Sequence, residues 1–145
     1  MKKRFWILAS LALATGWVHA DAGDVKARQQ YMKEWRGLNK QMGNIIKSSN
    51  AQSFPADDFA ALAAQLSSTA NEPWQHFGAD SRGSDSEAAD AVWNKPQAFQ
   101  AAIRQFNQSV ADLDRAAKSG RYDAVKTAYS QMAQNCKTCH QAFKD

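Results

Sequence analysis

Two cysteines and a histidine stand close together near the end of this sequence. The chain of 145 residues has only two cysteines, Cys136 and Cys139, and His140 follows the second one directly. Residues three and four apart share one face of a helix, so the three side chains point the same way if this segment is helical. Such a set could bind a metal ion, form a redox dithiol or hold a cofactor.

The spacing C-x-x-C-H is the attachment signature of c-type haem. Two thiols at this spacing add across two vinyl groups of one porphyrin, and the adjacent imidazole reaches the iron from one side. We therefore expect one covalent haem c per chain, bound through Cys136 and Cys139, with His140 as the proximal iron ligand.

Other interpretations of the same residues remain open. A redox dithiol of the thioredoxin kind expects a βαβ context, of which the sequence shows no sign. A zinc site would need a fourth ligand, and His76 is the only other histidine after residue 20. A disulfide across so short a loop would constrain little of the unfolded chain.

The first twenty residues indicate export. A basic start (KKR) precedes a mostly apolar stretch, and residues 18–20 (VHA) form a cleavage-type tripeptide. This pattern is typical of a secretory signal peptide, so we expect residues 1–20 to be removed and residues 21–145 to form one domain in the periplasm. No second long apolar stretch follows, so no membrane span is expected in the mature chain.

The charge of the mature chain is nearly balanced. Residues 21–145 contain 15 basic and 14 acidic side chains, which gives a net charge of +1. There is no basic run with interleaved aromatic residues, so the sequence does not predict a nucleic-acid surface.

The elements that would position the motif are predicted to be four amphipathic helices. Apolar residues recur at steps of three and four, which is the period of one helix face. The predicted helices are 24–47, a second that opens at Pro55 and ends before Pro73, 96–119 and 122–143. Residues 72–90 are rich in Gly, Ser and Asp and indicate a loop. Two short connections and one long one favour an all-α, antiparallel four-helix bundle.

The mature chain resembles the class II cytochromes c, the cytochrome c′ family. Four stretches carry the resemblance in order along the chain: VKARQQYM, PWQHFGADS, AVWNKPQAF and CKTCHQAFK. The last contains the haem motif and is the most specific of the four. The resemblance implies a four-helix bundle that holds haem c.

In this family a residue of the first helix, four positions after an arginine, covers the distal side of the iron. The matching residues here are Arg28 and Met32. Six-coordinate relatives carry a methionine that binds the iron, so the resemblance implies Met32 as second iron ligand of an electron carrier that works with redox partner proteins. The alternative is a protein that binds nitric oxide or carbon monoxide at an open or displaceable distal site. A methionine on an apolar helix face can also be ordinary core packing.

Arg28 lies on the predicted core face of the first helix, where a buried charge is costly unless it is paired. A haem propionate would be a suitable bidentate partner, and the resemblance implies the same. The other interpretation is a guanidinium that reaches out to solvent. Lys144 follows His140 by four residues, where the family often has a basic residue near the proximal face. Five further residues are expected to pack the pocket and core: Trp35, Phe106, Tyr129, Met132 and Phe143.

Relatives often pair as antiparallel dimers through their first two helices. The first predicted helix has a wide apolar surface, so we expect a homodimer through it; the surface consists of Tyr31, Trp35, Leu38, Met42 and Ile45. No enzymatic activity is expected and no catalytic residue is assigned, because the sequence lacks a distal histidine–arginine pair of the peroxidase kind.

Overall fold

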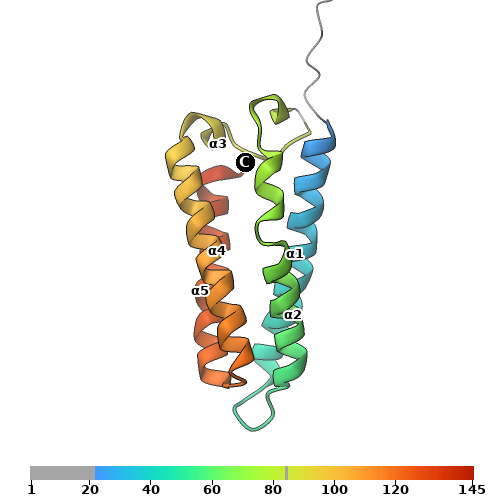
Figure 1. Cartoon of the computed structure of the whole chain (residues 1–145), viewed down its shortest axis with the longest axis vertical. Coiled ribbons are helices and arrows are strands. Elements are labelled where there is room, and N and C mark those ends of the chain that lie inside the picture. The colour runs from blue at the N-terminus through green and yellow to red at the C-terminus, as the bar shows by residue number, and fades with distance from the viewer. Residues whose placement is uncertain (1–21, 84) are drawn as a thin grey trace, which may run out of the picture.

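The computed structural model describes residues 22–83 and 85–145, which form the predicted all-α four-helix bundle (Figure 1). The four long helices are α1 (Ala22–Ser48), α2 (Ala56–Thr69), α4 (Pro96–Lys118) and α5 (Tyr122–Phe143). Consecutive long helices run antiparallel, as Figure 1 shows. The expected signal peptide, residues 1–20, lies outside the described residues. Within the described part, no helix has the length and apolar character that a membrane span requires.

The helix ends follow from local chemistry. Pro96 begins α4 as predicted, since proline at a first helical position has a suitable fixed φ and no N–H to satisfy. Pro55 was expected to be helical but precedes α2, with a non-helical ψ of 80°. Gly120 has a φ of +66° and turns the chain between α4 and α5, as its place after the last apolar residue predicts. The bounds of α5 match the predicted range.

The long connection between α2 and α4, residues 70–95, is more ordered than the predicted loop. It contains two short 3₁₀ helices, η1 (Glu72–His76) and η2 (Ala79–Ser81), and one turn of helix, α3 (Ala91–Asn94). Its later part forms backbone hydrogen bonds with the end of α5 and the residues that follow it. The Ala89 N–H donates to the Phe143 carbonyl, and the Asp145 N–H donates to the Glu87 carbonyl, both at 3.0 Å. The connection and the end of α5 are thereby joined at the upper end of the bundle in Figure 1.

The most completely buried side chains lie at the lower end, near the two short turns. Four side chains there are fully buried: Met42, Phe59, Leu113 and Val125. A second, smaller apolar cluster of Val92, Phe99 and Ile103 joins α3 to the upper part of α4. The two ends of the bundle are therefore packed differently.

The apolar surface predicted on the first helix is largely internal. Trp35, Leu38 and Met42 are at most 8% exposed and pack in the bundle's own core. Tyr31 and Ile45 are partly buried against that core. The prediction of a wide exposed surface was wrong, because one side of a helix in a bundle of this shape is covered by two neighbours. The homodimer stays a prediction without that support.

Candidate cofactor-binding site

A cavity of about 630 Å³ opens at the upper end of the bundle, lined by α1, α5 and the long connection. Its volume lies within the roughly 300–1,000 Å³ that cofactor and small-molecule sites usually have. Most of the lining side chains are aromatic or aliphatic. Charged lining residues that are exposed stand at its mouth: Lys33, Arg36, Glu87 and Lys144.

The α5 side of the cavity carries the motif. Cys136, Cys139 and His140 all line it, as their spacing predicts. Both cysteines are free thiols, and the Cys136 thiol donates to the sulfur of Met132 at 3.7 Å. Burial, with Cys139 nearby, raises the pKa of Cys136 to about 11, and burial also raises the pKa of Cys139. A redox dithiol works through a thiolate of lowered pKa, so these surroundings disfavour that interpretation.

His140 stands at the mouth of the cavity and is exposed to solvent. The protein packed around the ring lowers its pKa through desolvation, and the positive charges of Lys144 and Arg36 act in the same direction. Glu87 opposes them. The balance favours the neutral imidazole, which is the form that binds a metal ion.

A zinc site is disfavoured. His76, the only other histidine among the described residues, lies in η1, and its Nδ1 is 2.6 Å from the Asp24 Oδ1 rather than in the cavity. Among residues 22–83 and 85–145, no group of three or more His, Cys, Asp and Glu side chains could hold a metal ion.

Met32 lines the cavity from α1 and is half-buried. Beside it, the rings of Trp35 and Phe106 stack with their centroids 4.9 Å apart. Met132 and Phe143 line the same cavity, as expected, whereas Tyr129 does not. The hydroxyl of Tyr129 instead donates to the Asn39 carbonyl at 3.1 Å and holds α5 against α1.

Arg28 is 3% exposed, as its place on the core face predicts, but its guanidinium is bound by the long connection. One terminal nitrogen donates to the His76 carbonyl and the Ser81 hydroxyl, both at 2.7 Å. The other donates to the Ser81 carbonyl at 3.0 Å and the Ser86 hydroxyl at 2.6 Å. The guanidinium also lies 4.6 Å from the centre of the Phe77 ring. Four of its five N–H donors thus form hydrogen bonds to other described residues. Burial lowers the pKa of Arg28, and the negative charge of Asp24 opposes this effect.

Sequence analysis did not assign Ser81, Ser86 and Asn39 to the site. The two serines lie in a stretch whose composition only indicates a loop, and nothing local to them pointed to Arg28. Asn39 did carry a signal, since it is a polar residue on the apolar face of the first helix. Its side-chain oxygen is buried without a hydrogen-bond partner within the described residues, and the residue lines the cavity.

These residues fit a haem c. Two thiols and an imidazole on one wall are the groups that would attach it, and the aromatic and thioether side chains of the other walls suit its apolar faces. The cations at the mouth suit the negative edge of such a group.

The comparison with known families agrees with this donor set. The family model described as "Cytochrome C'" matches residues 24–144. The chain belongs to the cytochrome c′ family. Membership implies a covalent haem c, and the two cysteines that such a group requires are present.

Several curated relatives are cytochromes. The cytochrome c′ of Rubrivivax gelatinosus is 34% identical over 93 residues, which are 63% of this chain and 72% of that protein. The cytochrome c′ of Rhodospirillum rubrum is 27% identical, with 98% of both chains covered. Cytochrome c-556 of Agrobacterium tumefaciens is 29% identical, with 85% of this chain and 98% of that protein covered.

Solved structures of a cytochrome c′ share the fold. A variant of the Alcaligenes xylosoxidans protein with bound carbon monoxide aligns with a TM-score of 0.77 and 24% identity, covering 84% of this chain and 94% of that one. Another variant of that protein, ferrous and with bound nitric oxide, aligns equally well over 84% of this chain and 93% of that one. At this identity the likeness shows the fold, a cytochrome c′ four-helix bundle.

Proposed function

We propose that this chain is a periplasmic haem c protein that binds a diatomic gas, nitric oxide or carbon monoxide, on the Met32 side of the cavity. One observation supports this proposal most strongly: two thiols and an imidazole from α5 line the same cavity as the thioether of Met32 from α1. The family resemblance alone favours the electron carrier. The comparisons move gas binding ahead, because solved structures that share this chain's fold include complexes with both gases.

In this proposal each residue has a distinct role. Cys136 and Cys139 would hold the haem through thioether bonds, and His140 would bind its iron. Haem c, when bound, supplies an iron that can take one further ligand on its distal side. Met32 covers that side with a flexible, apolar side chain that can bind weakly or move away.

Part of the cavity wall near Met32 is apolar, although α1 also contributes polar lining residues, namely Arg28, Gln29, Lys33, Arg36 and Asn39. Trp35 is buried, and its indole N–H donates to the Thr69 hydroxyl at 2.9 Å, so that donor is occupied. Leu66 and Phe106 add further apolar surface to the cavity. A small, nearly apolar gas is suited to such a wall.

The electron carrier remains the second candidate, and Met32 itself favours it. A thioether that lines the cavity could bind the iron permanently, and His/Met ligation favours the reduced state. The oxidised protein would then be low-spin, with a weak sulfur-to-iron band at the red edge of the visible spectrum.

The deciding experiment follows carbon monoxide binding to the reduced protein by absorption. We expect a full complex in wild type and faster binding in Met32→Leu, which keeps a similar volume and should cost below about 1.5 kcal/mol. Met42→Leu is the control, because Met42 is fully buried on the same helix away from the cavity. A low-spin wild type that takes up neither gas would overturn the proposal in favour of the electron carrier.

A further inference from the structure

Basic side chains gather on the outer side of α1. Four of them recur every seven residues and so share one face of the helix; they are Lys26, Lys33, Lys40 and Lys47. Arg36 lies beside them, three residues after Lys33. All five side chains are exposed.

A matching set lies on the adjoining face of α5. Tyr122 and Tyr129 donate to backbone carbonyls of α1 at 3.0 and 3.1 Å, so their face of α5 looks toward α1. Lys126 follows Tyr122 by four residues and shares that face. Lys137 and Lys144 lie three residues before and four residues after the histidine of the motif. All three lysines are exposed, so α1 and α5 together present one basic face of eight cations.

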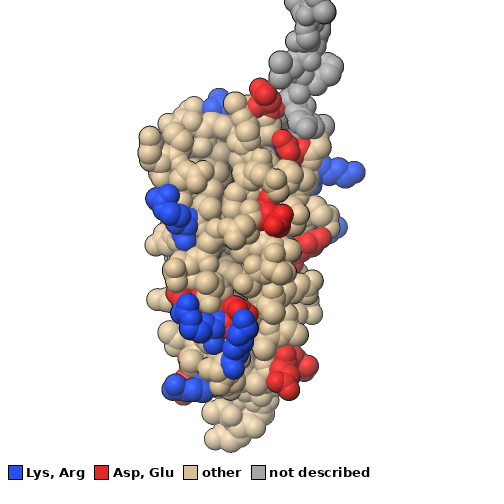
Figure 2. All heavy atoms as spheres, in the orientation of Figure 1, with Lys and Arg blue, Asp and Glu red and all other residues tan. Residues whose placement is uncertain are grey.

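The positive charge of this basic face is poorly compensated. Among the described residues, only Lys144 of the eight forms an ion pair, with the Glu87 Oε2 at 3.3 Å. The acidic residues of the two helices are few, namely Asp24, Glu34 and Asp123. Because residues 21–145 carry a net charge of only +1, negative charge must be concentrated elsewhere. Figure 2 views the bundle from the side of α2 and α4, where acidic and basic side chains are interspersed.

The mouth of the cavity opens in this basic face. Three cations, Lys33, Arg36 and Lys144, line it together with His140, against one acidic lining residue, Glu87, so positive charge predominates there. A field of one sign around an apolar opening steers molecules of the opposite charge to that opening. An approaching anionic surface would therefore be guided to the opening of the cavity that would hold the haem.

We propose that the basic face of α1 and α5 docks the acidic surface of a one-electron donor protein. The inference rests on the proposed function, because carbon monoxide and nitric oxide bind the ferrous iron and a donor must first reduce it. The donor loses one electron and this protein gains it, and no bond forms or breaks. A carboxylate-rich protein surface is the chemistry that eight lysine and arginine side chains would recognise.

An anionic membrane is the other surface such a face could meet. A helix that lies on a membrane inserts an apolar face beside its lysines. The apolar face of α1 instead packs in the bundle core, where Trp35, Leu38 and Met42 are buried. The observations therefore favour a protein partner.

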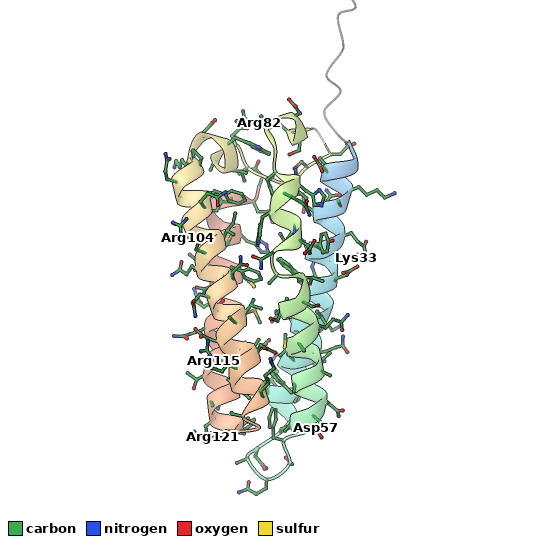
Figure 3. The ribbon with its side chains drawn as sticks, in the orientation of Figure 1. Lys33, Asp57, Arg82, Arg104, Arg115 and Arg121 are labelled. Atoms are coloured by element: carbon green, nitrogen blue, oxygen red, sulfur yellow. The ribbon has the colours of Figure 1, made fainter. Side chains whose placement is uncertain are left out.

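The test compares two double variants that change the net charge equally. Lys40→Glu with Lys137→Glu reverses charge on the basic face, and neither residue lines the cavity. Lys95→Glu with Arg104→Glu is the control. Both control residues are exposed, and Figure 3 shows Arg104 on α4, on the opposite side of the bundle from Lys33.

The first readout is the rate at which ferricyanide, a trivalent anion, oxidises the reduced holoprotein at low ionic strength. We expect the rate to fall about tenfold in the Lys40/Lys137 variant and by less than about twofold in the control, with both differences vanishing in high salt. Equal rates in both variants would overturn the inference, because only the net charge would then matter.

The second readout is binding without electron transfer. An acidic plant-type ferredoxin serves as the probe, and amide NMR signals of the oxidised holoprotein are followed during its addition. Perturbations along the basic face of α1 and α5, lost in the Lys40/Lys137 variant, are expected. Perturbations elsewhere, or tighter binding of the same face to phosphatidylglycerol vesicles, would reject the protein partner. Carbon monoxide binding should be equal in all variants, so failure here is distinct from failure of the proposed function.

Discussion

The hydroxyl oxygen of Tyr129 lies 2.6 Å from the position that a Cβ atom would occupy at Gly43. The same hydroxyl donates to the carbonyl of Asn39, a cavity-lining residue, and this hydrogen bond holds α5 against α1. Burial, with Cys136 adding to the effect, raises the pKa of Tyr129, so the hydroxyl keeps its proton in neutral solution. Only glycine at position 43 leaves room for this contact.

Gly43→Ala should therefore fail to stabilise the protein. In an open helix this change contributes about 1 kcal/mol, but here the new methyl group displaces Tyr129 and breaks a hydrogen bond worth about 0.5–1.5 kcal/mol. In Tyr129→Phe the obstructing oxygen is gone, and Gly43→Ala should then raise the free energy of unfolding by about 1 kcal/mol. Denaturant titrations of the four proteins form a double-mutant cycle.

The control for this cycle is Gly37→Ala. Apart from the adjoining turns of its own helix, no atom of the described residues lies within 4 Å of a Cβ at that exposed position. It should stabilise wild type and Tyr129→Phe alike, by about 1 kcal/mol. Equal gains from Gly43→Ala in both backgrounds would show that Tyr129 does not limit this position.

Replacing Arg28 by lysine should loosen the long connection. Lysine keeps the charge but has no planar fork to reach Ser81 and Ser86 together, and a buried cation would lose several hydrogen bonds. We expect a loss of about 2–4 kcal/mol in the free energy of unfolding and faster amide exchange over residues 77–89. Arg104→Lys, an exposed change on α4, should alter neither.

The same variant separates the two roles considered for Arg28. If the guanidinium serves a haem propionate instead, Arg28→Lys should shift the absorption spectrum and reduction potential while exchange over residues 77–89 stays at the wild-type rate. That result would contradict the hydrogen bonds to the connection as its main role.

Covalent attachment has a direct test. Acidic organic extraction should leave the haem on the wild-type polypeptide, because thioether bonds survive it. Cys136→Ser with Cys139→Ser should release all of it, and each single variant should retain one bond. Haem recovered in the organic phase from wild type would rule out the attachment through these residues.

The haem-free protein should be disordered mainly at its upper end. At ~24 cal/mol per Å³, a void of this size would cost on the order of 10 kcal/mol, comparable with the whole stability of a domain. We expect the walls to fluctuate while the cluster around Phe59, Leu113 and Val125 keeps slow amide exchange. Uniformly slow exchange, including Trp35 and Phe99, would show that the cavity persists without haem.

Periodicity alone was enough to predict the bundle. The steps of three and four that end at Phe143 reproduce α5 because that helix buries one continuous stripe, as do the steps through Phe99 and Leu113 for α4. The motif Cys136, Cys139 and His140 was predictable for the same reason, since helix geometry alone brings these residues to one wall.

The parts that sequence analysis missed depend on contacts between distant segments. Ser81 and Ser86 are ordered by Arg28, more than fifty residues earlier in the chain, so their local composition indicated only a loop. The exposed apolar surface expected around Leu38 disappeared because a single helix does not reveal how many neighbours will cover it. The basic face needed two helices to be placed side by side, which neither charge pattern alone could do.

The unequal packing of the two ends makes this bundle a candidate scaffold for protein design. Side chains such as Met42 and Leu113 secure the fold at one end, while the cavity lies at the other. Cavity-wall residues could therefore be randomised in a library, at positions such as Met32 and Leu66, with the opposite end held constant as the folding module. Variants selected from such a library would differ in ligand preference while sharing one expression and purification procedure.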